Sequence, residues 1–313
     1  MRIFLFFVLA LTLTAARAQV PLRILVGFPP GGSADVTARA LAEKLKDSLG
    51  QSIVVDNKPG AGGRLAADAL KASPADGSTL LFAPIGTTII LPLTVSSLGY
   101  DPWKDFTQVS QVVTFRFAFA VGPATPAKTM AEYVAWAKLG PKNATFGSPG
   151  AGTLPHFFGE MFGNAAGVKL THVAYKGGAP KVNDMLGGHL PAGVDTPLEY
   201  AEHHRSGKLR ILALSGEGRS AAFPDVPTFR EAGVNVDGTG WFGVHAPAGT
   251  PKAAIDRFAG AIQAAMRQPD IRERLFRLGL EATGTGSDEF VAIMREDRAR
   301  WEPVIKACGF RAD

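Results

Sequence analysis

Two glycine-rich turns contain most of the groups in this sequence that could bind a ligand. The first turn comprises Phe28, Pro30, Gly31, Gly32, Ser33 and Asp35, and the second comprises Ser148, Gly150, Gly152, Thr153 and His156. Each turn follows a short apolar run and leads into a helical pattern. The first N–H groups of a helix have no partner inside the helix and lie at the positive end of its dipole. Both turns therefore predict binding of a small anion by backbone donors and hydroxyls.

Three more side chains are candidates for the same site. Thr87 lies in a turn over residues 84–88, Tyr175 precedes a glycine pair, and Asp195 ends an apolar run over 192–195. Together with Phe28, we expect them to shape the space beside the bound anion. Two roles stay open for Asp195: it accepts a hydrogen bond from a ligand amine or hydroxyl, or it caps a helix.

The sequence contains none of the common local motifs for catalysis or cofactor binding. It has no P-loop, no complete dinucleotide fingerprint and no nucleophile elbow, and its six histidines do not have zinc-ligand spacing. The single cysteine, Cys308, cannot form an internal disulfide and is expected to be inert. We therefore expect a binding protein with no metal and no cofactor. The enzyme alternative is a secreted hydrolase that uses Ser33 or Ser148 with His156.

Composition and charge restrict the class of protein further. The 313 residues are 46% hydrophobic and 19% charged, which is ordinary for a globular protein, and their number suggests two domains. The formal net charge is +5, but Lys and Arg are scattered, so we expect no nucleic-acid partner.

The first 18 residues resemble a secretory signal peptide. Arg2 precedes an apolar stretch over 3–15, and Ala16, Arg17 and Ala18 form an A-x-A pattern that predicts cleavage before Gln19. The apolar stretch is shorter than the ~20 residues of a membrane span, so we expect export without stable membrane insertion.

Apolar runs alternate with helical patterns along the rest of the chain, which predicts doubly wound, mostly parallel sheets. Ser33 is expected to cap the first helix. The expected buried stripe of this helix comprises Ala34, Ala38, Leu41, Leu45 and Leu49. A long β-rich stretch over 109–121 and a strand over 241–246 are predicted to cross between two lobes. We place lobe 1 at 19–118 plus 242–313 and lobe 2 at 119–241. Ligands of such sheets bind beyond the carboxyl ends of the strands, where the glycine-rich turns lie.

The chain resembles the Bug-type (TctC-like) extracytoplasmic solute-binding proteins of tripartite tricarboxylate transporters over essentially its whole mature length. The motifs that carry the resemblance are VGFPPGGSAD (26–35), DNKPGAGG (56–63), ADGSTLL (75–81), YDPWKDF (100–106), GSPGAGTLPH (147–156), YKG (175–177), PDVPT (224–228) and WFG (241–243). Two positions depart from the family's pattern: Ala174 replaces a usual Pro, and His189 lies where the family usually has Gln.

The resemblance implies a two-lobed periplasmic binding fold, type II-like, that closes on a carboxylated solute. One carboxylate would bind at 28–35 and the far end of a di- or tricarboxylate, or of an acidic or aromatic acid, at 147–156. It also implies a monomeric protein in the periplasm of a Gram-negative cell that delivers its solute to a two-component membrane permease. A sensory co-receptor for a signalling kinase is the alternative.

Overall fold

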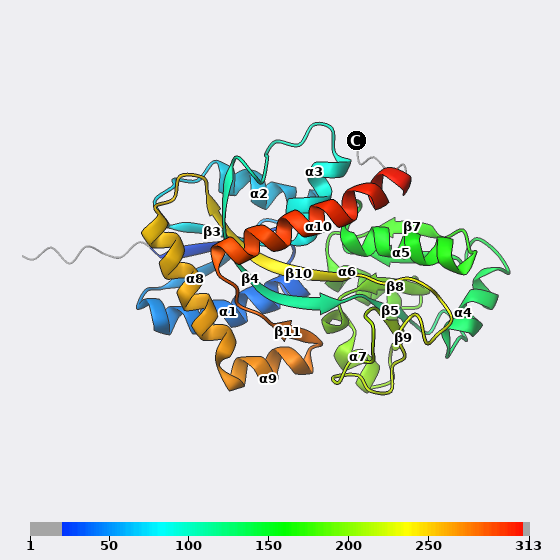
Figure 1. Ribbon diagram of the computed structural model, residues 1–313. Helices are drawn as coiled ribbons and strands as arrows, with labels where there is room; N and C mark the ends of the chain where they lie inside the picture. Colours follow the sequence, from blue (N-terminus) through cyan, green and yellow to red (C-terminus); the bar gives the residue numbers. More distant parts are fainter. Residues whose placement is uncertain (1–20, 309–313) are drawn as a thin grey trace, which may run out of the picture.

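The computed structural model describes residues 21–308, which form two α/β lobes side by side (Figure 1). The predicted signal peptide lies outside the described residues. No helix among residues 21–308 is long and apolar enough to cross a membrane.

The first lobe is built on a six-stranded sheet with the strand order β11-β4-β10-β3-β1-β2. Its strands are β1 (Leu22–Val26), β2 (Ile53–Asn57), β3 (Thr79–Pro84), β4 (Phe106–Arg116), β10 (Thr239–Pro247) and β11 (Leu280–Ala282). The helical elements of this lobe are α1 (Ser33–Leu49), η1 (Ala61–Gly63), α2 (Arg64–Lys71), η2 (Gly86–Ile90), α3 (Leu91–Thr94), α8 (Lys252–Arg267), α9 (Pro269–Arg277) and α10 (Ser287–Cys308).

The second lobe is built on a five-stranded sheet with the order β7-β6-β8-β5-β9. Its strands are β5 (Ala118–Val121), β6 (Thr145–Ser148), β7 (Thr171–Ala174), β8 (Ala192–Asp195) and β9 (Arg210–Leu214). Its helical elements are α4 (Met130–Ala137), α5 (Leu154–Ala166), α6 (Gly178–Leu186), η3 (Pro197–Glu199) and α7 (Ala201–Arg205).

Both sheets are mixed, whereas the sequence predicted mostly parallel sheets. β1 is parallel to β2 and β3, but β10 is antiparallel to β3 and to β4. In the second sheet β5 is antiparallel to both of its neighbours. The reason is the connection between the lobes: a strand that returns from the other lobe runs opposite to the strand that left.

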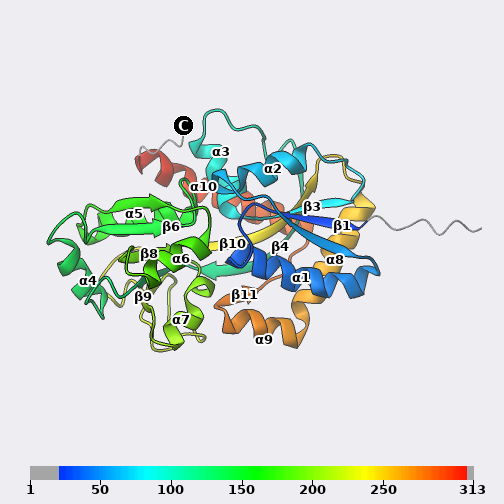
Figure 2. The same cartoon turned by 180° about the vertical axis from the view of Figure 1, so that it is seen from behind.

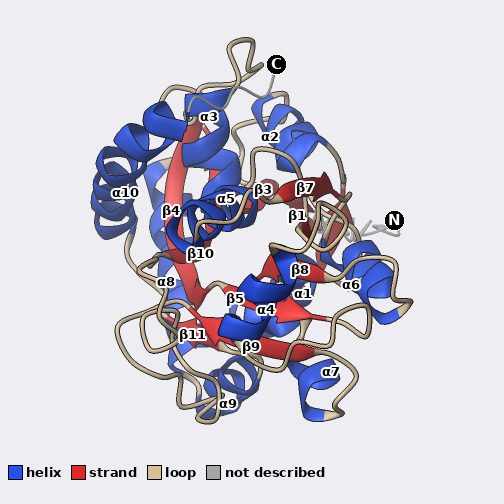
Figure 3. Cartoon of the chain, turned by 90° about the vertical axis from the view of Figure 1, so that its right-hand side faces the viewer, coloured by secondary structure: helices blue, strands red, loops and turns tan. Residues whose placement is uncertain are grey.

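The β-rich stretch over 109–121 is two strands, one in each sheet. β4 ends at Arg116, β5 begins at Ala118, and Phe117 between them is fully buried. The chain returns through β10, which pairs with β4 over most of its length (Figure 3). The predicted lobe boundaries after residues 118 and 241 stay a prediction; the strands place Ala118 in the second sheet and Thr239 in the first.

The opening helix has the predicted buried stripe but a different cap. Ala38, Leu41 and Leu45 are fully buried. The N-cap of α1 is Gly32, with extended backbone, and Ser33 is the first helical residue. The prediction that Ser33 caps the helix is therefore wrong, because Gly32 already supplies the backbone turn and leaves the Ser33 side chain outside the capping position.

The predicted turn over 84–88 is instead the start of a helical segment. η2 is a π-helix that continues directly into α3, and Thr87 and Thr88 are buried in it. The apolar run from Ile89 to Leu91 favours this outcome because its side chains pack into the core.

Candidate ligand-binding cleft

The first residues of α1 and α6 approach each other between the lobes (Figure 2). A cavity of about 40 Å³ lies there. Its wall is mostly apolar and includes Phe28, Ile85, Phe115, Leu154 and Phe242. Its polar side includes Ser33, Thr153, Asp195, Thr196 and Glu199. Space for only a few waters remains, so a solute of several carbons enters only when the lobes separate.

Five of the predicted site residues line this cavity: Phe28, Gly32, Ser33, Thr153 and Asp195. Gly150 and Tyr175 line an adjoining hollow of about 120 Å³, which also contacts Phe28. The other predicted residues, Pro30, Gly31, Asp35, Thr87, Ser148, Gly152 and His156, line neither space.

Asp35 supports the first turn from behind. Its carboxylate accepts hydrogen bonds from the Gly31 N–H and the Asn57 amide, each at 2.9 Å, and pairs with Arg39. Burial raises the pKa of Asp35, but the hydrogen bonds from Arg39, Gly31 and Asn57 outweigh burial and lower it. Asp35 therefore stays ionised and fixes the shape of the turn.

Thr87 is likewise structural. Its hydroxyl donates to the Gly62 carbonyl oxygen at 3.0 Å and lies outside the cavity. The bond joins η2 to the second glycine-rich turn of the first lobe.

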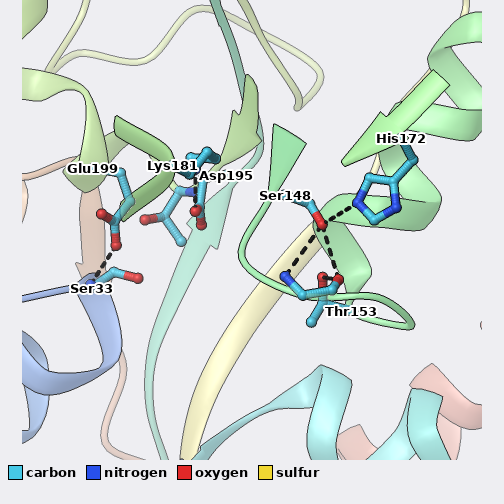
Figure 4. A network of polar contacts seen from close by, with 9 residues as sticks. Ser33, Ser148, Thr153, His172, Lys181, Asp195 and Glu199 are labelled. Carbon is cyan, nitrogen blue, oxygen red and sulfur yellow. Dashed lines mark hydrogen bonds and ion pairs between the residues drawn. The ribbon is translucent and has the colours of Figure 1, made fainter. Parts of the chain in front are cut away.

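The hydroxyls of the turn at 148–153 are used inside the second lobe. Thr153 Oγ1 donates to the Gly150 carbonyl oxygen at 2.7 Å, and Ser148 Oγ lies 2.9 Å from the same oxygen (Figure 4). The Gly152 N–H donates to His156 Nδ1 at 3.2 Å. These bonds hold the turn in shape and leave fewer of its donors for a ligand than the sequence suggested.

Ser148, which is buried, and His172, which is partly buried, form a pair with 2.7 Å between Oγ and Nε2. His172 also stacks on His156, with ring centroids 3.8 Å apart. Burial and the neighbouring His156 lower the pKa of His172 to about 3, and burial lowers that of His156 to about 4. Both rings are therefore neutral at physiological pH, and Ser148 has no exposed surface from which to attack a substrate.

Asp195 forms an ion pair with Lys181, a residue that the sequence did not single out. Lys181 is fully buried, and its Nζ also lies 4.7 Å from the centroid of the Tyr200 ring. The second oxygen of Asp195 accepts the Thr196 N–H at 2.8 Å. Asp195 thus caps none of the helices in the described residues, and contact with a solute stays a prediction supported by its place in the cavity wall.

Glu199 is the main group of the cleft that the sequence did not reveal. Its Oε1 accepts the N–H of Ser33 at 2.5 Å (Figure 4). A Cβ added to Gly178 would lie 2.3 Å from the Glu199 Cδ. The carboxylate therefore lies between the first residues of α1 and α6, and the sequence predicted an anion at the first of these two helix starts.

Burial and the nearby Asp195 carboxylate raise the pKa of Glu199, whereas Lys181 and Ser33 lower it, and the net pKa is about 7. Glu199 and Ser33 are separated by 166 positions, so no local pattern could have predicted this contact.

Thr196 provides a polar atom without a partner. The residue is 2% exposed, lines the cavity, and within the described part of the chain its Oγ1 has no hydrogen bond. Buried hydroxyls normally have a partner, so this one is a candidate contact for a solute.

No cluster of three metal-ligating side chains occurs among residues 21–308.

Two α/β lobes joined by crossing strands, with helix N-termini facing a cleft between them, define a periplasmic solute-binding protein. The comparisons with known proteins agree with this class. Residues 37–310 match the model of the tripartite tricarboxylate transporter family receptor, TctC. The chain belongs to this family. Because it is a family of solute receptors and not of enzymes, the hydrolase alternative is excluded.

Three relatives illustrate the match. The protein BugT of Bordetella pertussis is 34% identical over 92% of this chain and 89% of its own. A solved structure of Rpa4515 from R. palustris with adipate is 30% identical, with a TM-score of 0.88 over 93% of this chain and 98% of its own. MatC from Rhodopseudomonas palustris with bound malate is 28% identical, with a TM-score of 0.86 over 91% of this chain and 98% of its own.

Proposed function

We propose that this protein binds a small carboxylate in the interlobe cleft and delivers it to a two-component membrane permease. One observation carries the proposal: the N-terminus of α1 holds a carboxylate, that of Glu199, through the N–H of Ser33. A donor that holds this carboxylate can also hold that of a solute. The malate and adipate in the two related structures support the same chemical class.

The lobes supply the closing motion in this proposal. A solute that contacts both lobes binds the closed arrangement more tightly than the open one, so binding shifts the population toward closure. The permease then distinguishes loaded from empty receptor by shape. The signal peptide is removed after Ala18, and the mature protein acts as a monomer in the periplasm.

A thermal-shift panel tests the binding step. It contains malate, adipate, a tricarboxylate, an aromatic acid and an acidic amino acid. At a solute concentration near 100 times Kd, we expect stabilisation of about 2.7 kcal/mol, which is several degrees in Tm. No shift with any member of the panel would contradict carboxylate binding.

Uptake tests the delivery step separately. Cells of the native host that lack this gene should take up the tightest-binding labelled carboxylate more slowly than cells that carry it. Equal uptake would contradict delivery without affecting the binding proposal.

A further inference from the structure

Glu199 occupies the backbone donor that the proposed function assigns to the solute. Its carboxylate accepts the N–H of Ser33, the first residue of α1. Gly178 contacts the same carboxylate from the first residue of α6, at a distance that leaves no room for a side chain. A solute carboxylate cannot bind Ser33 in this way while Glu199 remains there.

The charges around Glu199 strengthen this competition. Lys181, on α6, is already paired with Asp195, at the end of β8. When Glu199 is ionised, the cluster of Lys181, Asp195 and Glu199 therefore carries one uncompensated negative charge, on Glu199. A second carboxylate beside it would be repelled in a site that is largely closed to water.

We propose that Glu199 is a specificity-determining residue: it is an internal occupant of the α1 carboxylate site, and an acidic solute binds by displacing it. The inference rests on the proposed function. It adds that affinity depends on a competitor within the protein, and that the cleft selects solutes whose carboxylate replaces that of Glu199 at Ser33.

Protonation of Glu199 should change the affinity for an acidic solute. The groups that face Glu199 are Asp195 of β8, Lys181 of α6 and Ser33 of α1, with Tyr200 following it in the chain. Because burial and Asp195 raise the pKa of Glu199 to about 7, the carboxylate is charged at pH 8 and mostly protonated at pH 6. A protonated carboxyl group binds an N–H more weakly than a carboxylate does. Affinity for acidic solutes should therefore rise as the pH falls from 8 to 6.

Calorimetric titration of malate and adipate into wild type, Glu199→Gln and Glu202→Gln tests the proposal. Glu202 is a matched control because it lies three residues away and its side chain is 79% exposed. At pH 8 we expect Glu199→Gln to bind at least fivefold more tightly than wild type, and Glu202→Gln to bind as wild type does. At pH 6 the difference between Glu199→Gln and wild type should shrink. The pH changes the charge of the solute equally in all three titrations. The ratio of the Kd of wild type to the Kd of Glu199→Gln therefore isolates the contribution of Glu199.

Equal or weaker binding by Glu199→Gln would overturn the proposal; weaker binding would show that Glu199 contacts the solute as a partner. A second measurement needs no solute. Because the Ser33–Glu199 bond joins the lobes, Glu199→Ala should increase the radius of gyration in X-ray scattering at pH 8, and an unchanged radius would also overturn the proposal. If neither acid binds to any variant, the scattering result still decides the role of Glu199, while the failed titration counts against carboxylate binding.

Discussion

The Ser33 N–H of the first lobe donates a hydrogen bond to the Glu199 carboxylate of the second lobe at 2.5 Å. This contact joins the two features on which the proposed function depends, the proposed carboxylate site at the N-terminus of α1 and the closure of the lobes. It also leaves no room for a side chain at Gly178, since a Cβ there would lie 2.3 Å from the Glu199 Cδ.

Gly177 should be required for closure. Its φ is +115°, and a Cβ at this position would lie 2.6 Å from Pro29 Cδ in the other lobe. We expect Gly177→Ala to weaken binding of malate or adipate at least tenfold, measured by calorimetry, because the lobes cannot approach fully. Gly188→Ala is the control: it also has positive φ, +74°, but a Cβ there meets no atom within 4 Å. Both variants should lose about 1–2 kcal/mol of stability from backbone strain; equal affinities would contradict the role of the Pro29 contact.

The Thr196 hydroxyl should contribute to binding and not to folding. It has no partner in the cavity wall, so Thr196→Val should leave the free energy of unfolding within about 0.5 kcal/mol of wild type. Affinity should fall about fivefold, which corresponds to one hydrogen bond of about 1 kcal/mol. Thr88→Val is matched, since Thr88 Oγ1 is also buried without a partner but lies outside the cavity. If both variants bind equally well, Thr196 does not contact the solute.

Loss of one partner of the Lys181–Asp195 ion pair should destabilise the protein more than loss of both partners. Lys181→Met leaves Asp195 as an unpaired buried charge, and we expect a loss of about 3–5 kcal/mol in urea unfolding. Adding Asp195→Asn removes that charge and should restore at least half of the loss. A double variant no more stable than Lys181→Met would show that packing, and not charge, accounts for the effect.

Glu199 should make stability depend on pH near neutrality. Its pKa is about 7 in the folded protein against an ordinary value of 4.5, so between these values the folded state binds more protons than the unfolded state. Stability should therefore fall as pH rises from 5 to 7, by at most about 1.4 kcal/mol per pH unit, and level off by pH 8. Urea unfolding of wild type and Glu199→Gln at pH 5, 6, 7 and 8 isolates this contribution. A constant difference between the two proteins would show that the pKa of Glu199 is not raised.

The local parts of the structure could be predicted from the sequence. The turn before α1 and the buried stripe of α1 follow from glycine, proline and apolar spacing, which act over a few residues. The split at Phe117 could not be predicted, because β4 and β5 share one apolar pattern and only tertiary pairing separates them.

The polar side of the cleft was harder to predict from the sequence than the local structure. Lys and Glu are usually surface residues, but Lys181 is fully buried and Glu199 is partly buried. The partner of Glu199, Ser33, lies 166 positions away in the chain. The turn at 148–153 suggested free hydroxyls, but its bonds to Gly150 and His172 appear only in three dimensions. The sequence could indicate which turns are suited to an anion. It could not show which of their donors already bond to other groups of the protein.

A crystal structure with the tighter-binding of malate and adipate tests the central claim most directly. The distance to measure runs from the nearest solute carboxylate oxygen to the Ser33 nitrogen. We predict 2.7–3.2 Å, the range of an N–H···O hydrogen bond, with the Glu199 carboxylate displaced from Ser33. A solute carboxylate bound elsewhere, with Glu199 still on Ser33, would contradict the account.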